Sequence, residues 1–347
     1  MIHPGSGRPR LLLCINPGSG AGRGVGAGSE AAARLRSGGA DVETLRVPGD
    51  DGTPAAARYA AALTERLRHR PGRGPDAVVV VGGDGMVHVT ANVLAGTGIP
   101  LGVVPAGTGN DTVRSWGWAE SGVRESTGRI LRSLGHPPRS VDLARVELRP
   151  LGQGVAGPGA TVVRYAVSGV NVAFDAAVNA TANRLRWPRG GLRYVVAVLT
   201  ELMRYRPAVL RVVVDGEPAL DGPAFVLCIM NGRFIGGGME VTPGTRVDDG
   251  ILEAFHVPPL NPVRFLRVFP RVFSGRHTGI PEVTIRPARS VRIEGVEPAS
   301  PPGPEAAGRG AAEHGAVVFG DGEPLGRLPA TVTAADGMLA VLDDGEA

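Results

Sequence analysis

The chain has 347 residues, which is long for a single hydrophobic core, so we expect two domains. The sequence contains arginine but no lysine. Because a Walker A loop needs a lysine to reach the nucleotide phosphates, the composition excludes a P-loop NTPase. The formal net charge of +4 favours an anionic partner, whereas an aromatic content of 4% argues against a base-stacking platform, so we expect no nucleic-acid partner.

Cysteine usage and apolar run lengths indicate the compartment. Cys14 and Cys228 lie in apolar, strand-like runs, where a free cysteine usually acts as a small core residue. We therefore expect no disulfide between them and a reducing, cytoplasmic location. Residues 11–15 are too short for the apolar region of a signal peptide, and no run reaches the length of a membrane span. Membrane contact is therefore expected to be peripheral, at the inner face.

The N-terminal third alternates strand and helix patterns. Residues 10–16 predict a first buried strand, and a glycine-rich turn then leads to a helix over 29–36. Residues 55–68 predict a second helix, which a proline-rich stretch ends. This rhythm is typical of a parallel sheet with helices on its faces.

One motif in the first turn points to a dinucleotide. Gly22, Gly24 and Ala27 satisfy G-x-G-x-x-A, although so glycine-dense a stretch meets that pattern easily by chance. Dinucleotide binding also requires an acidic residue at the end of the second strand, whereas Asp41 precedes that strand, residues 42–47. An NAD-dependent oxidoreductase is therefore a less favoured alternative.

The most informative stretch begins at residues 78–81, four consecutive valines. This run predicts a strand buried on both faces at the centre of a parallel sheet. Gly82, Gly83 and Gly85 then bracket Asp84. The following residues have helical spacing, so the positive end of a helix would point at the same place. The combination predicts a phosphate cradle.

A second polar turn follows the next strand. Residues 101–104 predict a strand that leads into PAGTGND, which carries Thr108, Asn110 and Asp111. Each turn alone is also typical of an ordinary strand-to-helix connection. Because the two turns follow neighbouring strands, we expect them to lie side by side and to form a crevice.

The pattern changes from residue 161 onward to short strands separated by turns, with a helical excursion over 176–204. Residues 297–313 are rich in proline and lack periodicity, so we expect a disordered insertion there. The predicted class is α/β: a Rossmann-like parallel-sheet nucleotide-binding domain over 1–143, then a β-sandwich or other β-rich domain over 144–332. A terminal strand over 333–347 completes the chain.

GGDG followed, after one helix and one strand, by PxGTxND resembles the diacylglycerol kinase catalytic domain family of lipid kinases. That family includes sphingosine kinases and is distantly related to NAD kinases. Residues 16–20, NPGSG, match its NPxSG motif. The resemblance implies an ATP-binding domain, a β-rich substrate domain with the acceptor entering between them, and a last strand that returns to the first domain.

The resemblance also implies a reaction. In a Mg²⁺-dependent reaction, ATP would donate its γ-phosphoryl group to a lipid hydroxyl. The simplest acceptor is diacylglycerol, which would give phosphatidic acid. Sphingoid bases, other lipids and soluble polyols stay open as acceptors, because no motif identifies the pocket that selects them. A homodimer also stays open.

The family pattern assigns nucleotide contacts to both turns. The positions are Asn16, Gly82, Gly83, Asp84, Gly85, Met86, Val87, His88, Val89, Gly107, Thr108, Asn110 and Asp111. Met86 stands where the family usually has threonine, and Val89 stands where it usually has glutamate. One hydroxyl and one carboxylate are therefore missing, which leaves open a non-catalytic relative that binds nucleotide or lipid without turnover.

Phosphoryl transfer also needs a base for the proton of the acceptor hydroxyl. The tripeptide DGE at residues 321–323 resembles the late motif that supplies this base in the family. Glu323 is the first choice and Asp321 the second, with Asp84 as a further catalytic candidate. The alternative is an ordinary hairpin turn, because a second DGE at residues 215–217 also lies between predicted strands.

Residues 231–257 give a third motif match, and the family binds a structural Mg²⁺ at its DG turn. Residue-by-residue matching implies the Asp249 carboxylate and the carbonyls of Arg246 and Ile251 as ligands, and Mg²⁺ prefers oxygen. Without the family, this turn is simply polar. Separately, six arginines surround an apolar helix and face either anionic lipid or solvent: Arg184, Arg186, Arg189, Arg193, Arg204 and Arg206.

Overall fold

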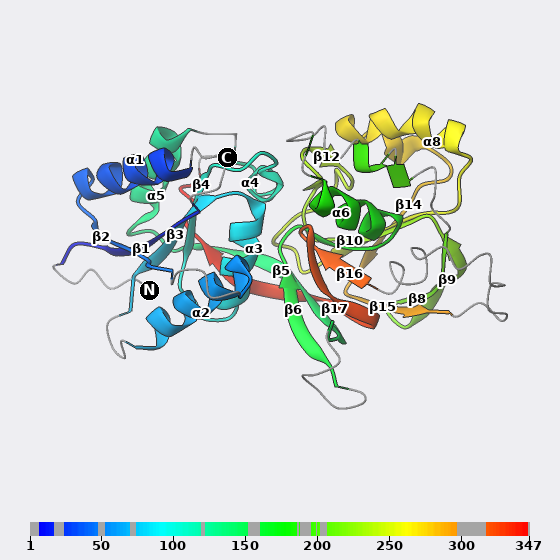
Figure 1. Cartoon of the computed structure of the whole chain (residues 1–347), viewed down its shortest axis with the longest axis horizontal. Coiled ribbons are helices and arrows are strands. Elements are labelled where there is room, and N and C mark those ends of the chain that lie inside the picture. The colour runs from blue at the N-terminus through cyan, green and yellow to red at the C-terminus, as the bar shows by residue number, and fades with distance from the viewer. Residues whose placement is uncertain are drawn as a thin grey trace. The chain divides into compact units, whose positions relative to one another are not determined.

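The structure is a computed structural model that describes residues 7–16, 24–47, 53–69, 74–118, 122–151, 160–185, 187, 196–198, 200–201, 207–296 and 317–345. The chain forms two compact units (Figure 1), one made of Met1–Asp142 with Gly337–Ala347 and the other of Leu143–Asp336. Two strands, β5 (Arg139–Arg149) and β17 (Glu323–Val341), carry the chain from one unit into the other.

The first unit contains a parallel sheet in the order β2-β1-β3-β4. Its strands are β1 (Arg10–Ile15), β2 (Asp41–Thr44), β3 (Ala77–Gly82) and β4 (Leu101–Pro105). All six residues of β3 are buried, which confirms the prediction of a central strand from the run of valines. Beyond β4, Val341 at the end of β17 pairs in parallel with Leu101.

The described residues of this unit form five helices: α1 (Gly24–Ser37), α2 (Ala55–Arg68), α3 (Asp84–Leu94), α4 (Asp111–Ser115) and α5 (Val123–Ser133). The helices α1 and α5 pack together on one side of the sheet, and α2 and α3 pack together on the other (Figure 1). The alternation along β1 explains this division, because Leu11 and Leu13 belong to the core that α1 and α5 cover, whereas the Cys14 thiol contacts Tyr59 of α2.

The helix α1 begins five residues before its predicted start. Glycine lowers helix propensity, so residues 24–28 were expected to be a turn. Close packing accounts for the difference, since a Cβ added to Gly28 would lie 2.6 Å from Cδ1 of Ile15. Glycine therefore brings the start of α1 directly against β1.

The second unit is β-rich, as predicted, and its strand pairs are antiparallel. One path of paired strands runs β14-β13-β10-β7-β16-β17, while β15 links β17 to β8 and β9, and β5 pairs with β17 and β6. The remaining strands are β6 (Val162–Ala166), β7 (Gly169–Ala173), β8 (Ala208–Val214), β9 (Glu217–Ala224), β10 (Val226–Met230), β11 (Phe234–Ile235), β12 (Met239–Glu240), β13 (Leu252–Val257), β14 (Thr284–Ala288), β15 (Ser290–Gly295) and β16 (Val317–Gly320).

Strand β10 is buried on both faces and separates two cores. Leu227 and Ile229 point into the large core shared with β8, β15 and β17. Cys228 and Met230 point into a second core on the opposite face. That face is covered by helices together with the short strands β11 and β12.

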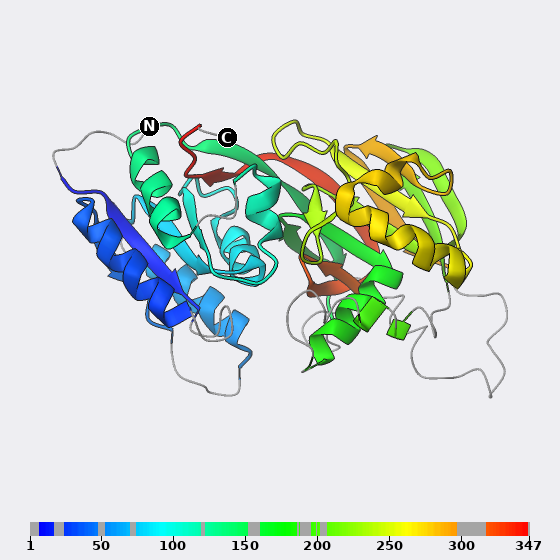
Figure 2. The same cartoon turned by 90° about the horizontal axis from the view of Figure 1, so that it is seen from above.

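The covering helices are α6 (Phe174–Arg184), α8 (Pro262–Val268) and two 3₁₀ helices, η2 (Phe269–Ser274) and η3 (Arg276–Gly279), as Figure 2 shows. The helix α6 confirms part of the predicted helical excursion. The segment from α8 to η3 was not predicted, although Asn261 caps α8 by accepting the Val263 N–H at 2.8 Å and Pro262 is its first residue. Residues 297–313, the expected insertion, lie outside the described residues.

Candidate active site

The two glycine turns of the first unit lie side by side. A Cβ added to Gly83 would lie 2.9 Å from the Gly107 Cα, and a Cβ added to Gly107 would lie 2.5 Å from the Gly83 Cα. Strands β3 and β4 set this approach, because Gly82 and Pro105 are paired at their carboxyl ends. Only glycine fits at both positions, so the sequence GGDG…PAGTGND builds one continuous surface of backbone.

Asp84 connects the first turn to the helix that follows the second. It is the first residue of α3, and its Oδ1 accepts the backbone N–H of Thr112 in α4 at 3.0 Å. The bond crosses 28 residues of sequence and joins the start of α3 to the start of α4. The carboxylate that the sequence placed among the catalytic candidates therefore also holds the two turns together.

Side chains in the second turn divide into those that shape it and one that is exposed. Asn110 has a left-handed backbone (φ 55°), and its Oδ1 accepts the Gly107 N–H at 3.2 Å. Asp111 is buried and its carboxylate lies 2.9 Å from Nη1 of Arg114. Thr108 is exposed. The Thr108 hydroxyl is thus the side-chain group of this turn that is open to a ligand.

The first turn of α3 contributes mainly backbone. The side chains of Val87 and His88 are buried, whereas Met86 and Val89 are half-buried. The first amides of a helix have no acceptor within it and carry the positive end of its dipole. Phosphate oxygens are the ligands that such amides favour. Asn16 directly follows β1, and its N–H donates to the Val81 carbonyl at 3.1 Å, whereas residues 17–20 lie outside the described part of the chain.

The late DGE tripeptide forms the hairpin between β16 and β17. Asp321 and Gly322 both have left-handed backbones (φ 52° and 85°), which is the geometry of a two-residue type I′ turn. The Asp321 carboxylate accepts three backbone amides, from Val167 at 2.8 Å, Ser168 at 2.8 Å and Gly169 at 3.1 Å. The next residue, Glu323, is exposed.

The earlier DGE tripeptide has the same local structure. Asp215 and Gly216 have φ values of 49° and 88° in the hairpin between β8 and β9. The Asp215 Oδ1 accepts the amides of Arg289 at 3.0 Å and Ser290 at 2.7 Å. Both tripeptides are therefore hairpin turns, and their conformation alone does not distinguish a catalytic motif from a structural one.

A buried polar network surrounds Asp321 and was not predicted as a unit. Ser168, Asn171 and Asn231 are between 1% and 4% exposed. The Asn231 Nδ2 donates to the Val167 carbonyl at 2.8 Å, and its backbone N–H donates to the Ser168 carbonyl at 2.9 Å. The late hairpin is thereby tied to the turn before β7 and to the residue that follows β10. The only sequence signal was a cluster of polar residues within strand-like runs.

The predicted metal turn has a donor set of suitable chemistry. Asp249 is exposed and its Oδ1 accepts the Ile251 N–H at 3.0 Å. A Cβ added to Gly250 would lie 2.9 Å from Oδ1 of Asp336, so a second carboxylate lies against this turn. Burial and the charge of Asp249 raise the pKa of Glu253. This oxygen-rich, negative setting fits Mg²⁺.

The same turn offers few side-chain ligands. Among the described residues, no group of three or more histidine, cysteine, aspartate or glutamate side chains is arranged to hold a metal. An ion at this turn would therefore rely on backbone oxygens together with Asp249. Arg246 and Ile251 carry the backbone carbonyls that the motif assigned.

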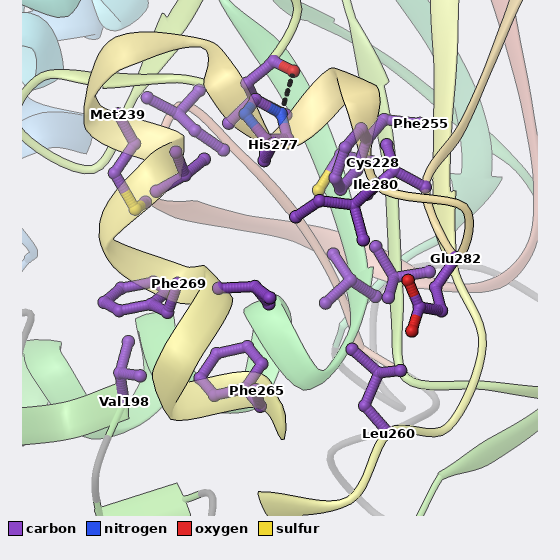
Figure 3. A pocket seen from close by; sticks show the side chains of 17 residues that line it. Val198, Cys228, Met239, Phe255, Leu260, Phe265, Phe269, His277, Ile280 and Glu282 are labelled. Carbon is purple, nitrogen blue, oxygen red and sulfur yellow. Dashed lines mark hydrogen bonds between the residues drawn. The ribbon is translucent and has the colours of Figure 1, made fainter. Parts of the chain in front are cut away.

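An apolar cavity of about 100 Å³ lies within the second unit, between β10, β13 and the segment α8–η3 (Figure 3). Phe265 and Phe269 project into it from the helical side and Cys228 from β10. Its other lining residues are Val198, Val226, Ile235, Met239, Val241, Phe255, Val257, Leu260, Val268, Val272, His277, Ile280, Glu282 and Val283.

The two polar side chains of the cavity wall, those of His277 and Glu282, each make a hydrogen bond within the protein. The His277 Nε2 lies 2.8 Å from the Val241 carbonyl, and burial lowers the pKa of this histidine, so the ring is neutral at physiological pH. Glu282 accepts a hydrogen bond from Nε of Arg264 at 3.1 Å. An apolar cavity several times larger than one water needs stays dry and favours hydrocarbon. No sequence motif indicated this pocket.

Comparison with known proteins decides the family. Residues 10–146 match the diacylglycerol kinase catalytic domain, and residues 168–343 match the YegS C-terminal NAD kinase beta sandwich-like domain. The chain is 35% identical over 333 residues to the diacylglycerol kinase of Mycobacterium tuberculosis. The aligned region covers 96% of this chain and 94% of that protein. The chain belongs to the diacylglycerol kinase family of lipid kinases.

This lipid kinase shares its fold with solved structures. The crystal structure of a diacylglycerol kinase from Bacillus anthracis aligns with a TM-score of 0.62 at 19% identity, covering 97% of each chain. Yeast NADH kinase complexed with NADH aligns with a TM-score of 0.51 at 11% identity, covering 96% of this chain and 82% of that one. The predicted family resemblance, including the distant relation to NAD kinases, is confirmed.

Two further sequence expectations bear on the membrane. None of the helices within the described residues combines the length and apolarity that a bilayer-spanning helix needs. Of the six arginines expected around an apolar helix, only Arg184 is described, and it is exposed at the end of α6. The lipid kinase thus has its candidate groups in two places. The glycine turns belong to the first unit, while the DGE hairpin, the metal turn and the cavity belong to the second.

Proposed function

We propose that this lipid kinase transfers the γ-phosphoryl group of ATP to the free hydroxyl of a diacylglycerol, in a Mg²⁺-dependent reaction that gives phosphatidic acid. The observation that carries the choice of acceptor is the apolar cavity of the second unit, because its wall is almost entirely hydrocarbon and suits an acyl chain better than a soluble polyol. The enzyme would work at the inner face of the membrane, where diacylglycerol is found in the bilayer.

The glycine turns support the proposed role of the first unit. Backbone amides at the start of α3 bind the phosphates, and the exposed Thr108 hydroxyl adds a donor. Because these ligands are backbone groups, the replacement of threonine by Met86 and of glutamate by Val89 removes side chains but leaves the cradle. Asp84 keeps the two turns in register through the Thr112 amide.

The DGE hairpin supports a division of roles between its two acids. All three of the amides around Asp321 donate to its carboxylate, so that side chain positions the hairpin. Glu323 is exposed and takes the proton from the acceptor hydroxyl. The hydroxyl oxygen bonds to the γ-phosphorus, the bond from that phosphorus to the bridging oxygen breaks, and ADP leaves.

Magnesium, when bound with the nucleotide, neutralises charge on the phosphoryl oxygens. A second, structural ion is proposed at the DG turn, held by the Asp249 carboxylate and the carbonyls of Arg246 and Ile251. Oxygen ligands of this kind, completed by water, suit Mg²⁺. The proposed ion would brace the loop between β12 and β13.

The direct test is incubation of the purified protein with γ-phosphate-labelled ATP, Mg²⁺ and a panel of lipid alcohols, followed by extraction into organic solvent. We expect label in phosphatidic acid, and we expect a chelator to abolish it until Mg²⁺ is restored. Label that appears only in a phosphorylated sphingoid base would identify that base as the acceptor in place of diacylglycerol. Label only in an aqueous product would identify a soluble acceptor. Nucleotide binding without any transfer would contradict the proposed reaction.

A further inference from the structure

The outer side of α8 and η2 exposes apolar side chains between arginines. Val263, Leu266 and Phe273 are 65%, 46% and 45% exposed, although large apolar side chains usually avoid water. Arg267 and Arg271 are exposed in the same segment. We call these five residues the docking face.

The inner side of the same segment lines the apolar cavity. Phe265, Val268, Phe269 and Val272 follow helical spacing and all contribute to the cavity wall. The rings of Phe269 and Phe273 meet edge to face, with centroids 5.9 Å apart, so a cavity residue packs directly against the docking face. A surface helix normally has one apolar side, which packs on the protein core. Packing on the core therefore does not explain the apolar side chains on the outer side of this segment.

Charge identifies the kind of partner. Residues 258–279 contain four arginines and no acidic residue. Arg264 is paired with Glu282, whereas Arg267, Arg271 and Arg276 have no acidic partner among the described residues. The carboxylate of Glu240, which lies beside Gly275, is already paired with Arg233. Apolar side chains flanked by uncompensated cations match a surface that is anionic outside and hydrocarbon within.

We propose that the docking face binds an anionic bilayer, with Val263, Leu266 and Phe273 entering the acyl region while Arg267 and Arg271 contact headgroups. The inference rests on the proposed function and names the surface through which the enzyme meets its lipid. Because one helical layer separates the docking face from the cavity, the lipid-binding side and the membrane-binding side of this segment are back to back.

A second copy of the chain is a less suitable occupant. A two-fold contact through this face would set the same arginines against one another, since symmetric interfaces pair a surface with itself. The segment has no acidic residue to oppose them. Like charges brought together across an interface weaken it.

The test is flotation of the full-length protein with phosphatidylcholine vesicles, with and without about one third phosphatidylglycerol. We compare the wild type with R267Q/R271Q and with V263S/L266S/F273S. Each arginine near an anionic surface contributes about fivefold to binding, so the double variant should bind anionic vesicles about 25-fold more weakly. The triple variant should lose binding to a similar or greater extent.

Control variants remove exposed side chains of the same kinds elsewhere. R211Q/R292Q deletes two other exposed arginines of the second unit, although these arginines are paired with Asp221 and Glu294, and V25S/V163S/V209S deletes three exposed valines. Both controls should bind anionic vesicles within about twofold of the wild type. If the triple variant is less stable in a thermal melt, L266S alone should still show the loss.

Activity on short-chain diacylglycerol in detergent micelles separates this inference from the proposed function. The docking-face variants should keep the micellar rate and lose only the rate on vesicles. Unchanged vesicle binding by both variants, or no binding by an active wild type, would overturn the inference. A shift from dimer to monomer in sedimentation, with vesicle binding intact, would assign the face to a second copy instead. Absence of micellar activity in the wild type would count against the proposed function alone.

Discussion

The second unit contains two hairpins with the same tripeptide, DGE at residues 215–217 and at residues 321–323. In each, aspartate and glycine adopt left-handed backbones and the glutamate begins the next strand. In each, the aspartate carboxylate accepts backbone amides from a segment far away in the sequence. The shared sequence therefore produces a shared local structure, as a type I′ turn requires.

The surroundings of the two hairpins differ. Asp215 holds the exposed turn between β14 and β15, at Arg289 and Ser290. Asp321 holds residues 167–169, where Val167 and Ser168 are buried and Asn231 donates a further hydrogen bond. The tripeptide therefore specifies a turn. Any catalytic role depends on the segment to which the turn is bonded and on the position of its glutamate.

The largest contrast should lie between the two glutamates. Glu323→Gln should lower kcat by about 100-fold or more, because a general base contributes roughly 10²–10⁴ to a rate. Glu217→Gln, the matched change in the other hairpin, should leave kcat within about twofold. Steady-state transfer to diacylglycerol measures both. Equal losses in the two variants, or no loss in either, would remove the assignment of Glu323.

Asp84 extends the comparison to the first unit, where an Asp-Gly pair again accepts a distant amide. Asp84→Ala should abolish measurable transfer, because the loss of the Thr112 contact frees the two turns and removes the carboxylate beside the phosphates. The protein should stay folded, since one hydrogen bond to a charged group contributes only about 1.5–3 kcal/mol. Calorimetry of ATP binding and a thermal melt check this, and a fully active variant would contradict the role of the turn.

The smallest predicted contrast concerns stability at the two aspartates. Asp321→Asn should destabilise the second unit by about 3 kcal/mol, because it weakens three bonds to buried amides. Asp215→Asn should lower the free energy of unfolding by about 1 kcal/mol, because the hydrogen bonds of Asp215 are exposed. Urea unfolding of each variant measures the difference. Equal shifts of the transition would show that the buried network adds nothing to the late hairpin.

Local patterns made much of the fold predictable. The four valines of β3 and the glycines after them predicted the central strand and the turn, because burial on both faces and left-handed or crowded backbone each restrict the residue types that fit. Alternating short strands predicted the β-rich second unit. The motif order then predicted the family.

Contacts between residues that are distant in the sequence could not be predicted from it. The bond from Asp84 to Thr112 spans 28 positions, and that from Asp321 to Val167 spans 154. Neither follows from spacing, because the partner is a backbone amide and carries no residue identity. The sequence motif consequently placed Glu323 first and Asp321 second as the base, without the hydrogen bonds that assign Asp321 to the turn.

The cavity escaped prediction for a different reason. The segment α8–η3 is apolar on both sides and is interrupted by Pro270 and Gly275, so its periodicity matches no single-sided helix. The lining residues come from strands and helices that only the fold brings together. A cavity enclosed by elements that are distant in the sequence produces no local sequence pattern from which it could be predicted.

The acyl-chain dependence of the rate tests the central claim most directly, since Cys228 projects into the cavity from β10 (Figure 3). Transfer of label from ATP is measured in micelles for diacylglycerols of increasing chain length, with the wild type, Cys228→Phe and, as the non-filling control, Cys228→Ala. The wild type and Cys228→Ala should favour long chains, whereas Cys228→Phe should lose that preference and keep activity on the shortest substrate. The same length dependence in all three proteins would contradict the placement of the acyl chain in the cavity.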